Sequence, residues 1–304
     1  MQSDRLLTAG LIDYAGLFPP AGLGMAEAAR NYAEYLGGQE AEMLGRFVLP
    51  ASRLSEFEET AADLLPRGAG ADPWKVAVLL TDSFADEIPR ILKFNCSHWA
   101  DSPSGHAVID VIEMKASTQA TIQGLRTSLP EFYRAFIELS VTERFTELLD
   151  ATRAANFSAK IRTGGVEPAA FPAASAIVTF MEECLARGLA FKATAGLHHM
   201  VCSTYPLTYE AGSASAPMFG FLNLFAAAVF LKSGTTQADV LAIMEENEAH
   251  AFVFTEEGMR WRGLEATNAQ IQEARTEFAI SFGSCSFNEP VEELSRLTTS
   301  TPST

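Results

Sequence analysis

Short β-rich apolar runs alternate with longer helical patterns along almost the whole chain. Eight of these runs are predicted as strands, and they cover residues 6–14, 45–49, 75–80, 107–113, 132–139, 157–162, 189–194 and 278–282. The gaps between the first seven carry helical patterns at 25–36, 52–65, 84–94, 117–129, 142–155 and 172–187. Alternating strands and helices favour a parallel sheet, and eight such units predict a closed (β/α)8, or TIM, barrel. We therefore predict a single barrel domain over residues 1–296 and a disordered, Ser/Thr-rich tail over 297–304.

One gap is much longer than the others. Residues 198–277 separate the seventh and eighth predicted strands. They contain an apolar helical pattern at 218–231, an acidic one at 237–250 and a predicted hairpin at 251–263. A long excursion from a barrel is typical of a lid over its mouth, of an oligomer contact or of both. The alternative is a decoration that only pads the core, and the sequence leaves open whether the protein is a homo-oligomer.

Charge and composition restrict the partners of the protein. The net charge of −16 disfavours nucleic-acid binding, which needs a basic face, but it permits a small anionic substrate held by a few local cations. No signal peptide is visible at the start, and the most apolar segment, 218–231, is shorter than the roughly 20 residues needed to span a bilayer. The four cysteines are irregularly spaced. These features predict a reduced, cytoplasmic protein with no membrane or nucleic-acid partner.

Two lysines lie in the middle of predicted strands, where an ammonium group is costly to bury. Lys160 lies in SAKIRTGG on the sixth strand and Lys192 in AFKATAGLHH on the seventh. Strand alternation places each of them on the more polar face of its strand, which would be the barrel interior. Two adjacent ammonium groups lower the pKa of at least one, which is how a lysine becomes a nucleophile for Schiff-base chemistry. The alternatives are that one lysine points outward or that each pairs with a carboxylate.

Four short motifs occur on the predicted strands in a consistent order. Residues 109–111 read IDV on the fourth strand, 160–164 read KIRTG on the sixth, 192–196 read KATAG on the seventh and 282–286 read FGSCS after the eighth. With these motifs the chain resembles the deoxyribose-phosphate aldolase group of class I aldolases. Those enzymes are (β/α)8 barrels with IDV, K-x-x-T-G, K-x-x-G-G and F-G-x-S-S motifs at these places. The opening strand, GLIDYAGL at 10–17, is also similar.

The resemblance implies a lyase of carbohydrate metabolism that uses no metal or other cofactor. Lys160 would form a Schiff base with a carbonyl substrate, Lys192 would tune it and Asp110 would move protons. The turn at 283–286 would bind phosphate. The chain departs from the family pattern at Arg162, at His198 and in the long insertion. These departures indicate a related chemistry on a different small anionic carbonyl compound, either a sugar phosphate or a keto or aldehyde acid.

Further candidates surround these motifs. Asp110 has a rival in Glu113, because the two have opposite parity and a regular strand points only one of them inward. Arg162 shares the face of Lys160 and offers a planar fork for a carboxylate or phosphate, unless it pairs with Glu113 or Glu138. The predicted substrate-binding set comprises Arg162, Thr163, Gly164, Gly165, Gly196, His198, Gly283, Ser284, Cys285, Ser286, Glu113 and Glu138.

Two other functions stay open at the level of sequence. The segment LHHMVC offers His198, His199 and Cys202, but no H-x-H or H-E-x-x-H pattern supports a metal site. A metal- or acid–base-dependent barrel hydrolase would use these histidines with Asp110 and Glu113. A barrel that binds a metabolite without catalysis is the third possibility. Metal content and covalent trapping distinguish the three.

Overall fold

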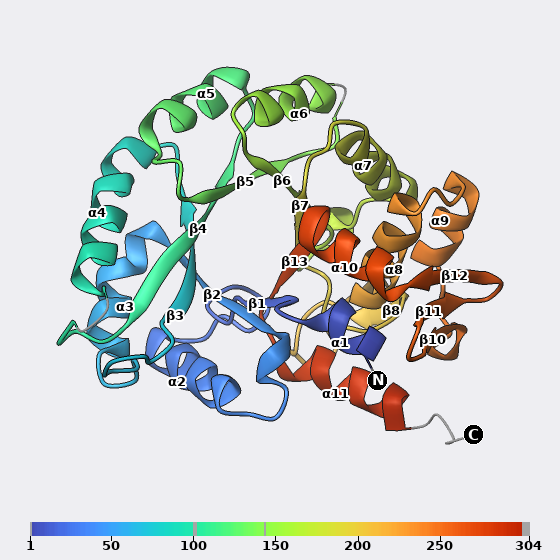
Figure 1. Cartoon of the computed structure of the whole chain (residues 1–304), viewed down its shortest axis with the longest axis horizontal. Coiled ribbons are helices and arrows are strands. Elements are labelled where there is room, and N and C mark those ends of the chain that lie inside the picture. Colours follow the sequence, from blue (N-terminus) through green and yellow to red (C-terminus); the bar gives the residue numbers. More distant parts are fainter. Residues whose placement is uncertain (1, 100–101, 143, 300–304) are drawn as a thin grey trace.

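Eight parallel strands close into a barrel, as the alternation in the sequence predicts. The computed structural model describes residues 2–99, 102–142 and 144–299. Around the barrel the strands follow the order β1-β13-β7-β6-β5-β4-β3-β2, and Figure 1 shows the ring with its helices outside. The barrel strands are β1 (Ile12–Tyr14), β2 (Leu44–Pro50), β3 (Trp74–Leu80), β4 (Ala107–Lys115), β5 (Arg134–Leu139), β6 (Ser158–Arg162), β7 (Phe191–Thr194) and β13 (Ala279–Ser284).

Amphipathic helices cover the outer face of the barrel. Their apolar sides and the outward side chains of the strands form the main core, whereas Val48, Ala77, Val111 and Phe136 form a separate buried cluster. These four follow the inward parity of their strands, so they fill the barrel interior as a packed layer. The outer helices along the first seven strands are α2 (Met25–Leu36), α3 (Leu54–Ala61), α4 (Phe84–Ser97), α5 (Gln119–Ser128), α6 (Phe145–Ala154) and α7 (Ala174–Ala186).

Both ends of the chain differ from the sequence prediction. The predicted first strand at 6–14 is shorter, because helix α1 (Gln2–Thr8) occupies its beginning. Gly10, with a φ of 57°, turns the chain from α1 into β1, a conformation that glycine adopts without steric penalty. At the other end, α11 (Asn288–Thr299) includes the first three residues of the predicted disordered tail. Residues 300–304 of that tail lie outside the described residues.

The long segment between β7 and β13 folds into several parts. It forms a hairpin of β8 (Ser203–Pro206) and β9 (Ser215–Met218), then α8 (Phe221–Lys232) and α9 (Gln237–Met244). A three-stranded antiparallel sheet follows, made of β10 (Phe252–Phe254), β11 (Gly258–Trp261) and β12 (Leu264–Thr267), before α10 (Asn268–Glu277) leads into β13. Helix α8 is almost wholly buried, and Phe221 stacks on Phe282 of β13. It therefore takes the place of the barrel helix between the last two strands.

The three-stranded sheet lies away from the mouth of the barrel. The Ser3 hydroxyl in α1 donates to the carbonyl of Thr255 beside this sheet, and β11 packs on α1. Because α1 leads directly into the N-terminal end of β1, the sheet is at the end opposite the C-terminal mouth. The prediction of a lid over the whole of 198–277 is therefore wrong for this part. The β8–β9 hairpin, in contrast, lies beside the mouth, where the ring of Tyr205 stacks on His199.

A buried arginine joins the first and last strands of the barrel. Arg275 of α10 donates from Nε to the carbonyl of Leu7 and from Nη2 to that of Ala9. Its Nη1 donates to the carbonyls of Ala279 and Ile280 at the start of β13. The Arg275 side chain thus links the segment just before β1 to the start of β13, the strand that pairs with β1 to close the barrel.

One helical stretch, Pro168–Ala186, is long and apolar enough to cross a membrane by length and composition alone. Its main part, α7, packs on the barrel instead: Ile177 and Phe180 are fully buried, and Phe180 contacts Phe191 of β7 edge to face. This location accounts for its apolar composition. The cytoplasmic location stays a prediction from the sequence, and the oligomeric state stays open.

Candidate active site

The two lysines predicted from the sequence lie side by side inside the barrel. Lys160 and Lys192 are directly opposite each other in the pairing of β6 with β7, and both are buried. Glu113 of β4 accepts from both: its Oε2 lies 2.7 Å from Lys160 Nζ and its Oε1 lies 2.5 Å from Lys192 Nζ. Both amines bind the same carboxylate, so the prediction that the two lysines lie close together is confirmed.

Lys192 lies deep in the barrel between two carboxylates. Its Nζ is 2.6 Å from Asp13 Oδ2, and Asp13 in turn accepts from the Ser281 hydroxyl and from the backbone N–H of Arg46. Burial alone would lower the pKa of Lys192, but Asp13 and Glu113 outweigh it and raise that pKa above its usual value. The alternative that a lysine pairs with carboxylates therefore holds for Lys192, and it is not a lysine whose pKa is lowered by mutual repulsion. It is a fixed cation, and the sequence interpretation missed Asp13, its second partner.

Two glutamates of this cluster, Glu113 and Glu138, are held ionised. Burial would raise the pKa of Glu113, but Lys160 and Lys192 lower it to about 2. Glu138 lies 2.8 Å from Lys160 Nζ through Oε2, while its Oε1 accepts from Arg162 Nε at 3.4 Å. These two cations also outweigh burial and lower the pKa of Glu138. Three carboxylates and three cations thus form one charge-balanced network, which is the condition for keeping ions buried.

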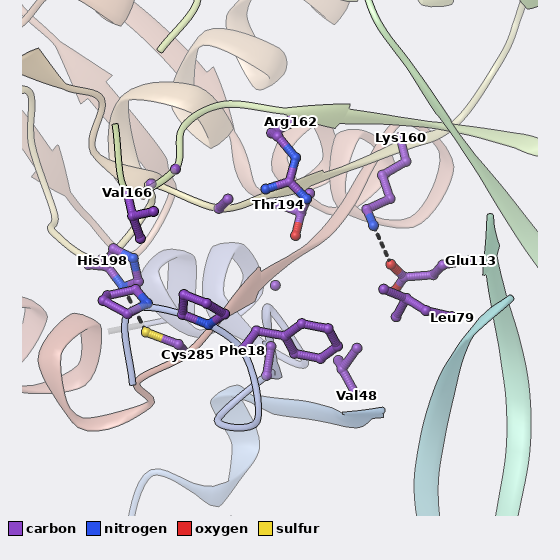
Figure 2. A pocket seen from close by; sticks show the side chains of 17 residues that line it. Phe18, Val48, Leu79, Glu113, Lys160, Arg162, Val166, Thr194, His198 and Cys285 are labelled. Carbon is purple, nitrogen blue, oxygen red and sulfur yellow. Dashed lines mark hydrogen bonds and ion pairs between the residues drawn. The ribbon is translucent and has the colours of Figure 1, made fainter. Parts of the chain in front are cut away.

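A cavity of about 240 Å³ opens above this network at the C-terminal ends of the strands. Figure 2 shows Lys160 reaching down to Glu113 on one side of it, with Phe18, Val48 and Leu79 forming an apolar wall. The rim carries polar groups: Arg162, Thr194, His198 and Cys285. Lys160 and Glu113 line the cavity and Lys192 does not, so Lys160 is the amine that a small molecule in the cavity meets.

Asp110, the predicted catalytic aspartate, lies elsewhere. It binds the guanidinium of Arg46 through both oxygens, at 2.7 and 2.6 Å. It is three residues nearer the N-terminal end of β4 than Glu113, or about 10 Å along the strand. The pairing of β3 with β4 skips Asp110, which is a bulge that breaks the regular alternation assumed in the sequence analysis. Glu113 therefore takes the inward position beside the lysines, and the assignment to Asp110 is wrong.

Arg162 is open to the cavity. Its side chain is 54% exposed and its single bond to Glu138 uses only Nε. It is therefore not locked between Glu113 and Glu138, and its outer N–H groups face the mouth. Figure 2 shows Thr194 beside it with its hydroxyl directed into the cavity. Strand parity indicates this orientation of Thr194, although the residue was not among the predicted site residues.

The turns after β6 and β7 are packed against each other. Thr163 is buried; its backbone N–H donates to the carbonyl of Thr194, and its hydroxyl donates to that of Ala195 at 2.6 Å. It holds the strand ends together rather than binding a ligand. Gly164 and Gly196 approach so closely that a Cβ on either would lie 2.8 Å from the Cα of the other. Gly165 and Gly196 line the cavity, whereas Thr163 and Gly164 support it from behind.

Only part of the turn after the last barrel strand faces the cavity. Gly283 and Cys285 line it, and burial raises the pKa of the Cys285 thiol to about 11. The hydroxyl of Ser284 lies 3.4 Å from His198 Nδ1. That of Ser286 accepts from the backbone N–H of Glu289 in the first turn of α11. Neither of the two serines predicted to bind phosphate lines the cavity, and the hydroxyl of each has a partner within the protein.

The two histidines have separate environments. His198 lines the cavity, and burial, followed by the nearby His199, lowers its pKa to about 4. His199 binds Glu293 at 2.7 Å and stacks on Tyr205. Among the described residues, no group of three His, Cys, Asp or Glu side chains is arranged to hold a metal ion. The residues proposed for a hydrolase are therefore not brought together, since Asp110 binds Arg46 and Glu113 binds the lysines.

Comparison of the chain with protein-family models, with curated proteins and with solved structures finds no match. The resemblance to the aldolase group stays a prediction from short motifs. The chemistry of the cavity is therefore the main guide to function.

Proposed function

We propose that this protein is a Schiff-base-forming lyase of the class I aldolase type, with Lys160 as the nucleophile. The observation that supports this most is the position of Lys160 at the floor of the mouth cavity, beside a carboxylate shared with a second lysine. The substrate would be a small carbonyl compound with an anionic group. Active sites of barrels of this kind lie at the same end of the strands.

The amine of Lys160 attacks only after it has lost its third proton. Glu138 is positioned to accept this proton, because its Oε2 lies 2.8 Å from Lys160 Nζ. Arg162, bound to the other oxygen of Glu138, makes that carboxylate a weaker base. When the anionic group of the substrate binds Arg162, it offsets this charge and makes Glu138 a better proton acceptor. Substrate binding would thus activate Lys160.

The neutral amine then adds to the carbonyl carbon. One of its two remaining protons moves to the carbonyl oxygen, and Glu138 returns its proton to the resulting hydroxyl group, which leaves as water. The product is an iminium ion on Lys160, with Glu138 ionised again. The bond between the α and β carbons then breaks, and its electron pair moves toward the iminium to form an enamine. The hydroxyl on the β carbon loses its proton to a carboxylate, so this carbon departs as a carbonyl compound. Protonation at carbon and addition of water release the second product.

Reductive trapping tests this proposal. The protein is treated with cyanoborohydride and a panel of small aldehydes and keto acids, and adducts are located by peptide mass mapping. We expect the adduct on Lys160 and its complete loss in Lys160→Ala. Lys93→Ala, which removes an exposed lysine of α4, is the matched control and keeps the wild-type adduct.

Two further variants test the assigned roles. Lys192→Met keeps Lys160 reactive but moves the pH dependence of trapping to higher pH, because a neighbouring positive charge is lost. Arg162→Lys keeps the charge but loses the fork, and weakens trapping of keto acids by roughly 1.5–3 kcal/mol, the range for a hydrogen bond to a charged group. An adduct on Lys192 reverses the roles of the lysines. No adduct with any carbonyl compound leaves a metabolite-binding barrel as the function.

A further inference from the structure

A second cavity, of about 460 Å³, adjoins the mouth cavity. Pro20 and His198 line both cavities, so a molecule that reaches past His198 passes from one to the other. The outer wall of the second cavity is the loop at 206–213, which joins β8 to β9, and its base carries Glu289 of α11. This hairpin is the part of the long insertion that lies at the mouth.

The second cavity differs from the first in charge. Its polar lining consists of hydroxyl groups, two histidines and the carboxylates of Glu210 and Glu289, and among the described residues that line it there is no lysine or arginine. Tyr209 donates to Glu289 Oε2 at 3.1 Å. Burial, the largest influence, lowers the pKa of His198 and so keeps its imidazole neutral at pH 7. A phosphate here would meet carboxylates and no fixed cation, although phosphate binding depends on charged donors.

The helix end that could attract an anion is also occupied. The turn before α11 is the place where the resemblance implies a phosphate site. The backbone N–H of Glu289 is bound by Ser286, and the carboxylate of Glu289 itself lies at this turn, beside His198 at 3.8 Å. The carboxylate of Glu289 thus occupies the position at the start of α11 where an anionic group of a substrate would otherwise bind.

We propose that the substrate extends from Lys160 past His198 into this second cavity, and that its far end is hydroxylated and carries no phosphate. This inference rests on the proposed function and specifies its substrate class. The single anionic group binds Arg162 near the reacting carbon. The hydroxyl groups of the distal chain donate to Glu210 and Glu289, since ionised carboxylates act only as acceptors. Glu289 is then a specificity-determining residue that rejects phosphorylated compounds by like-charge repulsion.

The test compares matched keto acids in cyanoborohydride trapping of the full-length protein. Polyhydroxylated 2-keto acids of five and six carbons are each used with and without a terminal phosphate, so every probe keeps a carboxylate for Arg162, and the rate of adduct formation at Lys160 is measured. In the wild-type protein we expect the unphosphorylated keto acid of each pair to react at least about tenfold faster. Glu289→Gln and, separately, Glu210→Gln should reduce this ratio of rates. Each variant is compared with wild type for the same keto acids, so differences in intrinsic reactivity between them cancel.

Glu292→Gln is the control, because it removes an exposed carboxylate from the same helix outside the cavity. It should keep the wild-type preference. Glu210 lies on the exposed hairpin loop, so its variant stays informative if Glu289→Gln disturbs the start of α11. Equal or faster trapping of the phosphorylated keto acids overturns this inference while leaving the aldolase proposal intact, as does a preference that neither variant changes. Failure of every keto acid to form an adduct at Lys160, with or without phosphate, contradicts the proposed function itself.

Discussion

At the scale of single residues, the barrel interior shows how an ammonium stays charged without water. Lys192 is fully enclosed, yet two carboxylates raise its pKa, and each of these is bound by further donors. Replacing such a partner leaves an unpaired ion, whose burial costs far more than the pair contributes. Lys160 belongs to the same network but opens to the cavity. The two lysines therefore differ in environment: Lys192 is fixed in charge, and Lys160 lines the mouth cavity.

His198 makes the stability of the protein depend on pH. Its folded pKa of about 4 lies below the ordinary value of 6.5, so the unfolded chain binds more protons between these values. The free energy of unfolding should therefore fall as pH decreases from 6.5 to about 4, by up to about 3 kcal/mol from this group. Glu113 has a pKa of about 2, so its own contribution to the free energy of unfolding changes with pH only below pH 4.5.

Urea unfolding of the wild type and His198→Gln between pH 4.5 and 7.5 measures this effect. The variant should show a shallower pH dependence in this range. His250→Gln removes an exposed histidine and should keep the wild-type slope. Equal slopes for the wild type and His198→Gln would show that burial of His198 does not drive the dependence.

The residues that could be predicted are those governed by strand alternation. Lys160, Lys192, Arg162 and Thr194 follow the parity of two regular strands, and the structure places them accordingly. Asp110 could not be placed, because the bulge in β4 leaves no clear sign in a run of residues that all suit a strand. The partnership of Asp13 with Lys192 also needs the barrel to close, since these residues are 179 positions apart.

At the scale of elements, the ends of β6 and β7 form the rim because two glycines let them approach. Gly196 has a φ of 75°, and an added Cβ would lie 2.9 Å from the ring of Phe171 as well as close to Gly164. The alternation of elements predicted these strands and most of the outer helices. The position of the three-stranded sheet in the long insertion was not predictable, because it depends on contacts with α1, which is far away in the sequence.

Gly196→Ala should therefore distort the rim. Adding a side chain in the left-handed region and against backbone should lower the free energy of unfolding by about 2 kcal/mol or more, and should slow trapping at Lys160. Gly263→Ala is the matched control, because a Cβ there meets nothing within 4 Å. Thermal unfolding and the trapping rate measure both effects. A Gly196→Ala protein as stable and reactive as the control would show that the rim tolerates the wider spacing.

At the scale of the whole molecule, the barrel is closed by contact between its first and last strands. Strand β1 has only three residues and pairs with β13 on one side and β2 on the other. Arg275 strengthens this closure by donating to four carbonyl groups on both sides of it. Burial lowers the pKa of this guanidinium to about 10, yet it is still a cation at pH 7.

Arg275→Met should lower the free energy of unfolding by about 3 kcal/mol or more, because buried carbonyls lose a charged donor. Arg260→Met, which removes an exposed arginine paired with Glu265, should change it by no more than about 0.5 kcal/mol. Urea unfolding gives the stabilities, and hydrogen exchange should show faster opening of β1 and β13 than of β4. A stability equal to that of Arg260→Met would mean that strand pairing alone closes the barrel.

The link between Asp13 and Ser281 also has a consequence for synthesis on the ribosome. Asp13 emerges early, but its partners Lys192 and Ser281 emerge much later. Until β13 has been made, the nascent sheet carries open edges at β1 and β7, and such edges invite pairing with other chains. The charged network cannot be completed one strand at a time. Its assembly is therefore delayed until β13 has been synthesised, and chaperones that shield open strand edges matter most before that point.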